Sequence, residues 1–503
     1  MRSVRLSFTR MLHIPRIIIT GLSGGAGKTM VSLGLARALA RQGLAVRAFK
    51  KGPDYIDAAW LSLAARAPQG NLDPFFMPGA ALRELFVRMA AGYDLALVEG
   101  NRGLFDGLDI DGSCSTAEVS RIIQAPLILV LDCTKMTRTV AALVKGCMTF
   151  EQGLTIGGVI LNRTGNSRHR AMVQRAVEEL CNVPVLGVLP RKAEGLIAER
   201  HTGLAGMGEC VQANALLDGV ADFIADHVDL AAVRSLAKSA TDLPEASSFA
   251  PPEQSGVRFQ SESKAGTGAT PAVPPGQAVI IGYVLDAAFW FYYHENLEAL
   301  QAAGAVLEPV SLLDDALWPE LDGLYIGGGL PDLYAETLSA KTAKRSLVAF
   351  LSRAGLPIYA ECGGFMYLAD HLVVDGKKFP MAGVFSCAVE FYPKPQGLGY
   401  VMAETLEENP FHPVGISLPG HEFHFSRCIP DHSGMQRHSF RLSRGRGMFT
   451  APDGSGRDGL LQQNTFASYT HIYAPALPHW APSFVALCRK TKHRTESLLS
   501  DVP

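Results

Sequence analysis

A glycine-rich segment near the N-terminus holds the residues best suited to bind phosphate. It reads Gly21-Leu-Ser-Gly-Gly-Ala-Gly-Lys28-Thr29 and stands between an apolar run and a helical pattern. Backbone N–H groups in such a loop converge on phosphate oxygens, and the helix N-terminus adds partial positive charge. Leu22 stands where the strict G-x-x-x-x-G-K-[ST] pattern has its first glycine, so the loop is a variant. We predict a nucleotide site rather than a plain glycine turn, formed by Gly24, Gly25, Gly27, Lys28 and Thr29.

Two later stretches place charged side chains directly after apolar runs. They are residues 50–57 (KKGPDYID) and residues 99–106 (EGNRGLFD). In a parallel α/β sheet, such positions line the crevice at the carboxyl ends of the strands. Carboxylates there can hold Mg²⁺, and a lysine such as Lys50 can neutralise charge during phosphoryl transfer. Turn preferences alone also explain Gly, Pro and Asp. Two such stretches downstream of a phosphate loop favour a functional role.

A second candidate centre surrounds Cys362 in the segment Glu361-Cys362-Gly363-Gly364. This segment runs from an apolar strand pattern directly into a helical pattern. A cysteine there sits on a sharp turn near a helix N-terminus, which suits a nucleophilic thiolate. A lone cysteine is more often an inert core residue, but the flanking glycines favour a strained turn.

A nucleophilic cysteine needs a base, and the sequence offers several histidines. His471 follows an apolar and aromatic run, whereas His421 and His424 flank Glu422 in the segment GHEFHFS. The H-E-x-H spacing also resembles a metal site, but the helical H-E-x-x-H spacing is absent and the aromatic alternation indicates a strand. Gly327 to Gly329 can supply oxyanion-hole N–H groups. Spacing alone does not choose the base.

The elements that position these residues form two α/β halves. In the first half, short apolar strand runs alternate with helical stretches such as Met30–Arg41, which predicts a parallel sheet covered on both faces. The second half repeats the pattern, with irregular strands expected from Ser417–Ser426 onward. The predicted strands are Arg16–Thr20, Leu44–Phe49, Asp94–Glu99, Pro126–Asp132, Gly157–Asn162, Val185–Leu189, Ala278–Val284, Gly323–Ile326 and Pro357–Ala360.

A segment from about Thr241 to Gln277 separates the halves. It is rich in Pro, Ser, Gly and Ala and poor in large apolar residues, so it buries too little surface to offset its ordering entropy. We therefore expect a first domain, which carries the phosphate loop, over residues 1–240, a flexible linker over residues 241–277, and a second domain over residues 278–490.

Composition excludes several classes of protein. The chain has 503 residues, of which 48% are hydrophobic, and its 46 basic and 48 acidic residues give a net charge of −2. We expect no nucleic-acid partner. The nine cysteines show no C-x-x-C spacing, which indicates a reducing cytoplasm. No apolar run reaches the roughly 18 residues of a membrane span. The N-terminal apolar stretch reads as a first strand rather than a signal peptide, with Met11 as an alternative start.

These motifs together resemble the cobyrinic acid a,c-diamide synthase family, in which an ATP-dependent synthetase domain is fused to a class I glutamine amidotransferase domain. The resemblance runs in order along most of the chain and rests on GLSGGAGKT, FKKGPDYID, VEGNRGLFDG, IGGGLPDLYA, YAECGGFMYL, GHEFHFS and ASYTHIY. FKKGPDYIDAAW is similar to the a,c-diamide synthases rather than to the related cobyric acid synthases.

The resemblance implies roles for individual residues. Cys362 would be the glutaminase nucleophile, His471 its base, and Asp106 a catalytic acid of the synthetase half. Oxyanion or glutamine contacts would come from Gly328, Gly363, His421 and Glu422. ATP would contact the phosphate loop and Lys50. The Mg²⁺ ligands would be Thr29, Asp54, Asp57 and Glu99.

The implied reaction is amidation of tetrapyrrole acetate groups through an acyl phosphate, with glutamine, ATP and the tetrapyrrole as small-molecule substrates. No membrane partner is expected, and a homodimer is a candidate assembly. Two segments depart from the family pattern. Tyr473 stands where many class I amidotransferases carry the glutamate that orients the histidine. Asn101 and Arg102 replace apolar residues beside the expected tetrapyrrole site, which leaves sirohaem or nickel-sirohydrochlorin as alternative substrates.

Two other classes of protein share part of these features. P-loop ATPases of the partitioning type resemble the first half, but Ser23 stands in place of their extra signature lysine and they do not explain the Cys362 segment. A tetrapyrrole-binding module with an inactive glutaminase is the second alternative.

Overall fold

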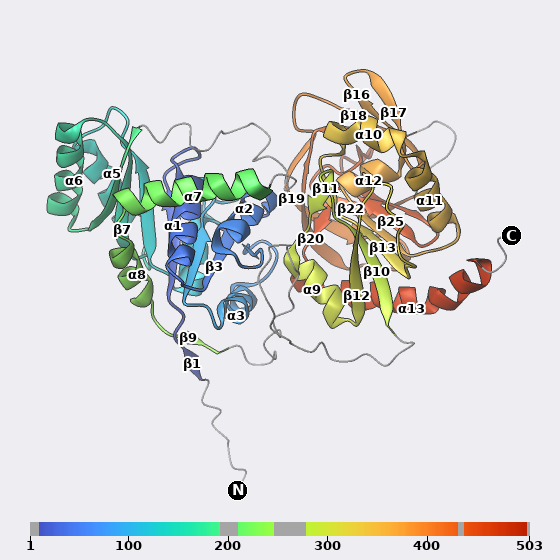
Figure 1. Cartoon of the computed structure of the whole chain (residues 1–503), viewed down its shortest axis with the longest axis horizontal. Helices are drawn as coiled ribbons and strands as arrows, with labels where there is room; N and C mark the ends of the chain where they lie inside the picture. Colours follow the sequence, from blue (N-terminus) through green and yellow to red (C-terminus); the bar gives the residue numbers. More distant parts are fainter. Residues whose placement is uncertain (1–9, 192–209, 246–277, 431–436, 500–503) are drawn as a thin grey trace, which may run out of the picture. The chain divides into compact units, whose positions relative to one another are not determined.

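The computed structural model describes residues 10–191, 210–245, 278–430 and 437–499. Contacts divide the chain into two compact units, residues 1–268 and 269–503. Each unit has its own sheet and its own core (Figure 1). No helix among the described residues is both long and apolar enough to cross a membrane.

The first unit contains a seven-stranded sheet in which every pair of neighbours is parallel. Its order is β4-β3-β5-β2-β6-β7-β8, so β2 lies in the middle and its residues are all buried. The strands are β2 (Arg16–Gly21), β3 (Val46–Lys51), β4 (Asn71–Leu72), β5 (Leu95–Glu99), β6 (Leu127–Asp132), β7 (Ile156–Thr164) and β8 (Val185–Pro190). The prediction of a buried parallel sheet is confirmed, because continuous apolar runs can be buried on both faces only when helices cover them.

Helices connect these strands and cover the sheet. Helices α1, α2 and α7 pack against one another, and their apolar residues share a core with β2, β3, β5 and β6. The helices are α1 (Lys28–Arg41), α2 (Tyr55–Ala65), α3 (Gly79–Ala90), α4 (Thr116–Ile123), α5 (Thr139–Phe150), α6 (Ser167–Cys181), α7 (Cys210–His227) and α8 (Leu230–Lys238).

The start of the expected linker belongs to the first unit. Leu243–Pro244 forms β9, which pairs antiparallel with β1 (Met11–Leu12). Leu243 is fully buried, and Thr241 accepts a hydrogen bond of 2.6 Å from the Arg16 guanidinium through its backbone oxygen. One buried leucine and one buried arginine thus hold the first residues of the predicted linker to the first unit. Residues 246–277 and 1–9 lie outside the described residues.

The second unit is built on an eleven-stranded mixed sheet. Strands β12, β10, β13, β15 and β25 are parallel, and antiparallel strands continue the sheet through β24, β22, β19, β20 and β26, with β23 beside β24. The strands are β10 (Val279–Val284), β12 (Ala305–Val310), β13 (Gly323–Ile326), β15 (Ile358–Glu361), β19 (Gly397–Thr405), β20 (Ser417–His424), β22 (His438–Arg444), β23 (Phe449–Thr450), β24 (Gly456–Gln462), β25 (Thr465–Ser468) and β26 (His471–Ile472).

Smaller sheets and helices complete this unit. A four-stranded sheet has the order β17-β16-β18-β21, and β11 pairs with β14. These strands are β11 (Phe289–Phe291), β14 (Gly328–Gly329), β16 (Ala369–Val374), β17 (Lys377–Pro380), β18 (Phe385–Phe391) and β21 (Ser426–Pro430). The helices are α9 (His294–Ala302), α10 (Ala335–Ala340), α11 (Thr342–Arg353), α12 (Gly363–Leu368) and α13 (Trp480–Leu499).

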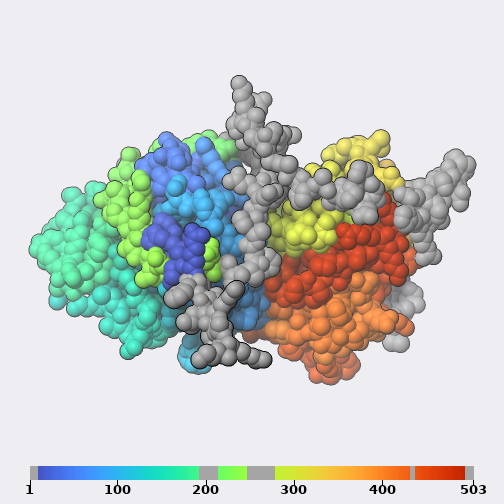
Figure 2. All heavy atoms as spheres, turned by 90° about the horizontal axis from the view of Figure 1, so that it is seen from below, coloured from blue at the N-terminus to red at the C-terminus, as the bar shows by residue number. Residues whose placement is uncertain are grey.

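Helix α13 returns to the beginning of the unit. Lys492 on this helix donates hydrogen bonds of 2.9 Å to the backbone oxygen of Ala278 and to Asp322. Figure 2 shows its red atoms against the yellow atoms at the start of the unit. The helix continues beyond residue 490, where the second domain was predicted to end, and Lys492 holds this part of it to the unit.

Candidate active sites in the two units

The phosphate loop joins the central strand β2 to helix α1. Gly25 and Gly27 have φ angles of +72° and +96°, which glycine adopts without steric cost. A Cβ on Gly27 would lie 2.2 Å from Nδ2 of Asn162, and this amide donates a 2.9 Å hydrogen bond to the backbone oxygen of Ala26. Gly24 has open space around it. Asn162 therefore holds the loop from the end of β7.

The two residues after the loop glycines contact different groups. Lys28 is buried, and its Nζ donates a 2.8 Å hydrogen bond to the backbone oxygen of Ser23. Burial, followed by the nearby Lys50, lowers the pKa of Lys28. The hydroxyl of Thr29 donates a 2.7 Å hydrogen bond to Oε1 of Glu99. The structure thus brings the loop beside the carboxylate at the end of β5.

Lys50 is the centre of a buried charge cluster. Its Nζ lies 2.8 Å from Oε1 of Glu99 and 2.6 Å from Oδ2 of Asp57. Burial alone would lower the pKa of Lys50, but Glu99 and Asp57 outweigh that effect and hold the pKa above its ordinary value. The lysine therefore stays charged. Strands β3 and β5 are neighbours, and their pairing sets Lys50 directly beside Glu99.

Asp54 shapes the helix that carries Asp57. It is the N-cap of α2, and its carboxylate accepts a 2.9 Å hydrogen bond from the backbone N–H of Asp57. Burial, followed by the charge of Asp57, raises the pKa of Asp54 to about 6. Asp54, itself a predicted metal ligand, therefore lies beside Asp57 and also caps the helix.

Asp106 lies on a loop that packs against the phosphate loop. The backbone N–H of Leu104 donates a 2.8 Å hydrogen bond to the oxygen of Gly21, and Asp106 accepts one of 2.8 Å from the N–H of Gly103. The Asp106 charge acts on Lys28, although the aspartate itself is exposed. Arg102 in the same loop is exposed and has a φ of +51°.

These oxygens fit a Mg²⁺ ion. Glu99 uses Oε1 for both Thr29 and Lys50, while its Oε2 is buried without a hydrogen-bond partner in the described part of the chain. Mg²⁺ takes one or two carboxylates and completes its shell with water and phosphate oxygens. Within the described ranges no group of three or more His, Cys, Asp or Glu residues is arranged to hold a metal. Mg²⁺ needs only one or two protein carboxylates, and the unpaired Oε2 of Glu99 beside the Thr29 hydroxyl meets that need.

In the second unit, Cys362 occupies a strained turn between β15 and α12. Its φ and ψ are 46° and −99°, a conformation that costs a non-glycine residue of the order of 1–3 kcal/mol and is typical of functional sites. Its backbone N–H donates a 2.7 Å hydrogen bond to the oxygen of Ser468. A Cβ on Gly364 would lie 2.2 Å from the backbone oxygen of Ile326, so only glycine fits there. The turn predicted from the ECGG segment is present.

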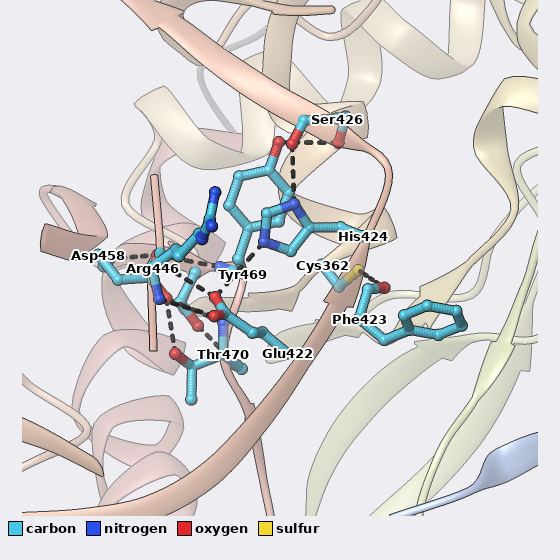
Figure 3. Close-up of polar contacts among 12 residues, drawn as sticks. Cys362, Glu422, Phe423, His424, Ser426, Arg446, Asp458, Tyr469 and Thr470 are labelled. Atoms are coloured by element: carbon cyan, nitrogen blue, oxygen red, sulfur yellow. Dashed lines mark hydrogen bonds and ion pairs between the residues drawn. The ribbon is translucent and has the colours of Figure 1, made fainter. Parts of the chain in front are cut away.

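Cys362 is 3% exposed, and its Sγ lies 3.9 Å from the backbone oxygen of Phe423 (Figure 3). Burial raises the pKa of the thiol well above its ordinary value, although the N–H of Gly363 opposes this effect. The thiol therefore rests protonated. Its reaction requires a base that accepts the proton as the sulfur attacks.

His471 and the glycine strand β14 lie close together. A Cβ on Gly328 would lie 2.5 Å from Cε1 and 3.3 Å from Nε2 of His471. A Cβ on Gly363 would lie 2.8 Å from the backbone nitrogen of Gly329. The absence of side chains at Gly328 and Gly363 thus allows the histidine ring, the glycine strand and the nucleophile turn to approach one another. The backbone N–H groups of Gly328 and Gly363 are the candidates for an oxyanion hole.

A carboxylate that our sequence analysis did not assign contacts this histidine. Oε2 of Glu361 lies 3.4 Å from Nδ1 of His471, and both side chains are buried. The place two residues after the histidine holds Tyr473, whose ring meets that of Tyr293 edge to face at 4.9 Å. The available signal was the position of Glu361 at the carboxyl end of a predicted strand.

His421 lies against His471 as the neighbouring residue across β20 and β26. The two rings stack at 4.8 Å with an interplanar angle of 15°, and His421 Nδ1 lies 3.3 Å from the hydroxyl of Tyr293. Burial, followed by the charge of His471, lowers the pKa of His421 far below its ordinary value. Nδ1 of His471 thus faces the carboxylate of Glu361, whereas Nδ1 of His421 faces the Tyr293 hydroxyl.

Glu422 and His424 flank Phe423 in β20, the residue whose backbone oxygen lies near the thiol, and they stabilise this strand (Figure 3). Glu422 accepts hydrogen bonds of 2.7 and 2.8 Å from the backbone N–H groups of Arg446 and Gly447. Burial opposes its ionisation, but His424 and these N–H groups hold the pKa of Glu422 below its ordinary value. His424 stacks on Tyr469 at 3.7 Å. Both Glu422 oxygens thus serve the chain itself, and its contact with glutamine stays a prediction.

Asp458 fixes the segment that leads from β25 to His471. It accepts hydrogen bonds of 3.0 and 2.9 Å from the backbone N–H groups of Tyr469 and Thr470, and one of 2.7 Å from the Thr470 hydroxyl. Asp458 is fully buried. Our sequence analysis missed this residue as well as Asn162. Asn162 ends a predicted strand and was detectable by the reasoning applied to Lys50, whereas nothing in the spacing pointed to Asp458.

Comparison with protein families assigns a class to each unit. Residues 17–202 match the family described as the CobQ/CobB/MinD/ParA nucleotide binding domain, and residues 280–476 match the CobB/CobQ-like glutamine amidotransferase domain. The predicted fold, a P-loop domain followed by an α/β glutamine amidotransferase domain, is confirmed.

Several curated relatives match along nearly the whole chain. A cobyrinate a,c-diamide synthase of Magnetococcus marinus is 41% identical over 95% of this chain and 98% of its own length. Proteins of the same name from Archaeoglobus fulgidus and Syntrophotalea carbinolica are 36% and 38% identical, over 96% and 95% of this chain and 99% of their own lengths.

Proposed function

This chain belongs to the cobyrinate a,c-diamide synthase family, and we propose that it amidates the a and c acetate carboxylates of cobyrinic acid. It is an ATP-dependent carbon–nitrogen ligase that uses glutamine as its nitrogen donor. The observation that carries the proposal is that relatives named for this reaction match 95–96% of this chain, a span that includes both centres. A partitioning-type ATPase does not account for the second match.

The second unit would release ammonia from glutamine. The Cys362 sulfur attacks the side-chain amide carbon and passes its proton to His471, while backbone N–H groups at Gly328 and Gly363 stabilise the oxyanion. Collapse of the tetrahedral intermediate breaks the C–N bond, and the leaving nitrogen takes the proton from His471. Water then hydrolyses the thioester to glutamate and restores the thiol.

The first unit would activate the acid that receives this nitrogen. A carboxylate is a poor electrophile, so transfer of the ATP γ-phosphoryl group to an acetate creates an acyl phosphate with a good leaving group. Lys28 and the loop N–H groups would neutralise the phosphate oxygens, and Lys50 would remain charged beside them. Thr29, Glu99 and Asp57 would hold a bound Mg²⁺, which supplies charge stabilisation to the phosphates. Attack by ammonia then releases phosphate and forms the amide.

The experiment that tests the substrate is incubation with ATP, Mg²⁺ and amide-¹⁵N-labelled glutamine. Cobyrinic acid, sirohaem and nickel-sirohydrochlorin are supplied in separate reactions, and the product masses are measured by mass spectrometry. We expect cobyrinic acid to gain two labelled nitrogens, and no label to transfer without ATP. Labelling of sirohaem or nickel-sirohydrochlorin in place of cobyrinic acid would contradict the proposed substrate and identify the correct one.

A further inference from the structure

Glu361 precedes the nucleophile Cys362 in the chain, and its side chain contacts the segment that carries the base His471. It is the last residue of β15, directly before Cys362, and its side chain is fully buried. Oε1 accepts a 3.2 Å hydrogen bond from the backbone N–H of Ile472, the residue after His471. Oε2 accepts one of 3.2 Å from the hydroxyl of Tyr325 and lies 3.4 Å from Nδ1 of His471.

We propose that Glu361 is the positioning residue of the glutaminase, because it holds the ring proton of His471 on Nδ1 and makes Nε2 the nitrogen that accepts the proton of Cys362. This inference rests on the proposed glutaminase role of Cys362 and His471. An ionised carboxylate accepts hydrogen bonds and donates none. A neutral imidazole has one N–H, so a carboxylate facing Nδ1 fixes that N–H there and makes Nε2 an acceptor.

The groups around Glu361 support an ionised carboxylate. Burial, followed by the charge of Glu361, raises the pKa of Tyr325 well above its ordinary value, so the phenol remains a donor. The Ile472 N–H can only donate. His421 stays neutral beside His471, since burial lowers its pKa. The carboxylate thus has two permanent donors, and Nδ1 of His471 lies 3.4 Å from its Oε2.

This arrangement also stabilises the charge that forms during the reaction. When Nε2 accepts the thiol proton, the ring becomes an imidazolium in a buried site. A carboxylate 3.4 Å away offsets that charge, as the aspartate does in serine-protease triads. Apo hydrogen bonds of catalytic groups often shorten only when substrate binds. A strand that supplies both the nucleophile and this carboxylate makes a glutamate two residues after the histidine unnecessary.

The variant Glu361→Gln tests the inference with little change in shape. The Ile472 N–H requires an acceptor, so it holds the amide oxygen at the Oε1 position. The amide NH₂ group then faces Nδ1 of His471 and forces the ring proton onto Nε2, where it blocks transfer from the thiol. We expect kcat for glutamate release to fall by about 10³–10⁴-fold, the cost of the corresponding change in a serine protease. The KM for glutamine should change little.

The matched control is Tyr473→Phe. It removes the hydroxyl from the place where many amidotransferases carry their glutamate and keeps the aromatic contact with Tyr293. We expect glutamate release close to the wild-type rate. In Glu361→Gln, ATP-dependent amidation with ammonium salt should persist, because the lesion is confined to the histidine. A Gln variant with wild-type kcat would overturn the inference, and so would a large loss in Tyr473→Phe with none in Glu361→Gln.

A measurement on the wild-type protein keeps the inference testable if the Gln variant does not fold. ¹⁵N NMR of ring-labelled histidine, assigned by the loss of signals in His471→Gln, reports which nitrogen carries the proton. We expect a protonated Nδ1 and a bare Nε2, and the reverse would refute the role of Glu361. Glutamate release needs no macrocycle. Failure of the proposed tetrapyrrole substrate therefore leaves these readouts unchanged.

Discussion

The variant Gly328→Ala tests how closely the oxyanion strand and the base are fitted together. The added Cβ would lie 2.5 Å from Cε1 of His471, roughly 1 Å short of an ordinary carbon–carbon contact. The ring cannot yield freely, since it stacks on His421 and lies beside Glu361. Either the ring or the glycine strand must therefore move by most of that distance.

A misplacement of about 1 Å in a catalytic group can cost about 10²-fold in rate. We expect Gly328→Ala to lower kcat for glutamate release by about that factor, while ammonia-dependent amidation continues. The assay measures both activities on the same preparation. Gly146→Ala in α5 is the control, because no atom lies within 4 Å of a Cβ at that glycine. Wild-type glutamate release by Gly328→Ala would refute the close packing argued here.

Two further predictions concern the synthetase unit and stability. Lys28→Ala should lower the rate of ammonia-dependent amidation, measured as amide product, by about 10²–10³-fold, because one charge-stabilising donor is lost. Glutamate release by this variant should not change, and the exposed-lysine control Lys145→Ala should keep both activities. Equal losses of amidation and glutamate release in Lys28→Ala would contradict the prediction. Burial, followed by His479, lowers the pKa of His412 to about 3 from 6.5, so the unfolded chain binds a proton that the folded chain does not, and the stability tied to His412 is lost as pH falls through 6.5 toward 3. His412→Gln should remove this dependence, so urea unfolding should show the stability difference from wild type shifting in favour of the variant by up to about 1.4 kcal/mol per pH unit as pH falls; a difference independent of pH would contradict it.

Local sequence patterns were sufficient to predict the sheets and much of the first site. Apolar runs predicted the parallel strands. Because ligands bind at the carboxyl ends of such strands, the sequence also predicted that the segments with Lys50, Asp57 and Glu99 line one crevice. The strained turn at Cys362 followed from the glycines after it. These features depend on residues that are close in sequence or on a general property of parallel sheets.

The features that were missed depend on contacts between distant segments. The family pattern places the glutamate that orients the histidine two residues downstream, where this chain has Tyr473. The carboxylate comes instead from Glu361, which the β15–β25 pairing brings to the segment before His471. Asp458 reaches Tyr469 and Thr470 from the neighbouring antiparallel strand. The register between paired strands sets such contacts, and spacing along the chain does not specify it.

The central claim is that one unit releases nitrogen from glutamine and the other fixes it to an acid. The most direct test compares the wild-type protein with Cys362→Ala, each given ATP, Mg²⁺, cobyrinic acid and either labelled glutamine or labelled ammonium. We expect the variant to fix nitrogen from ammonium at a rate close to that of the wild-type protein and none from glutamine. Glutamine-derived label in the variant's product, or loss of the ammonium reaction in a folded variant, would contradict this division of roles.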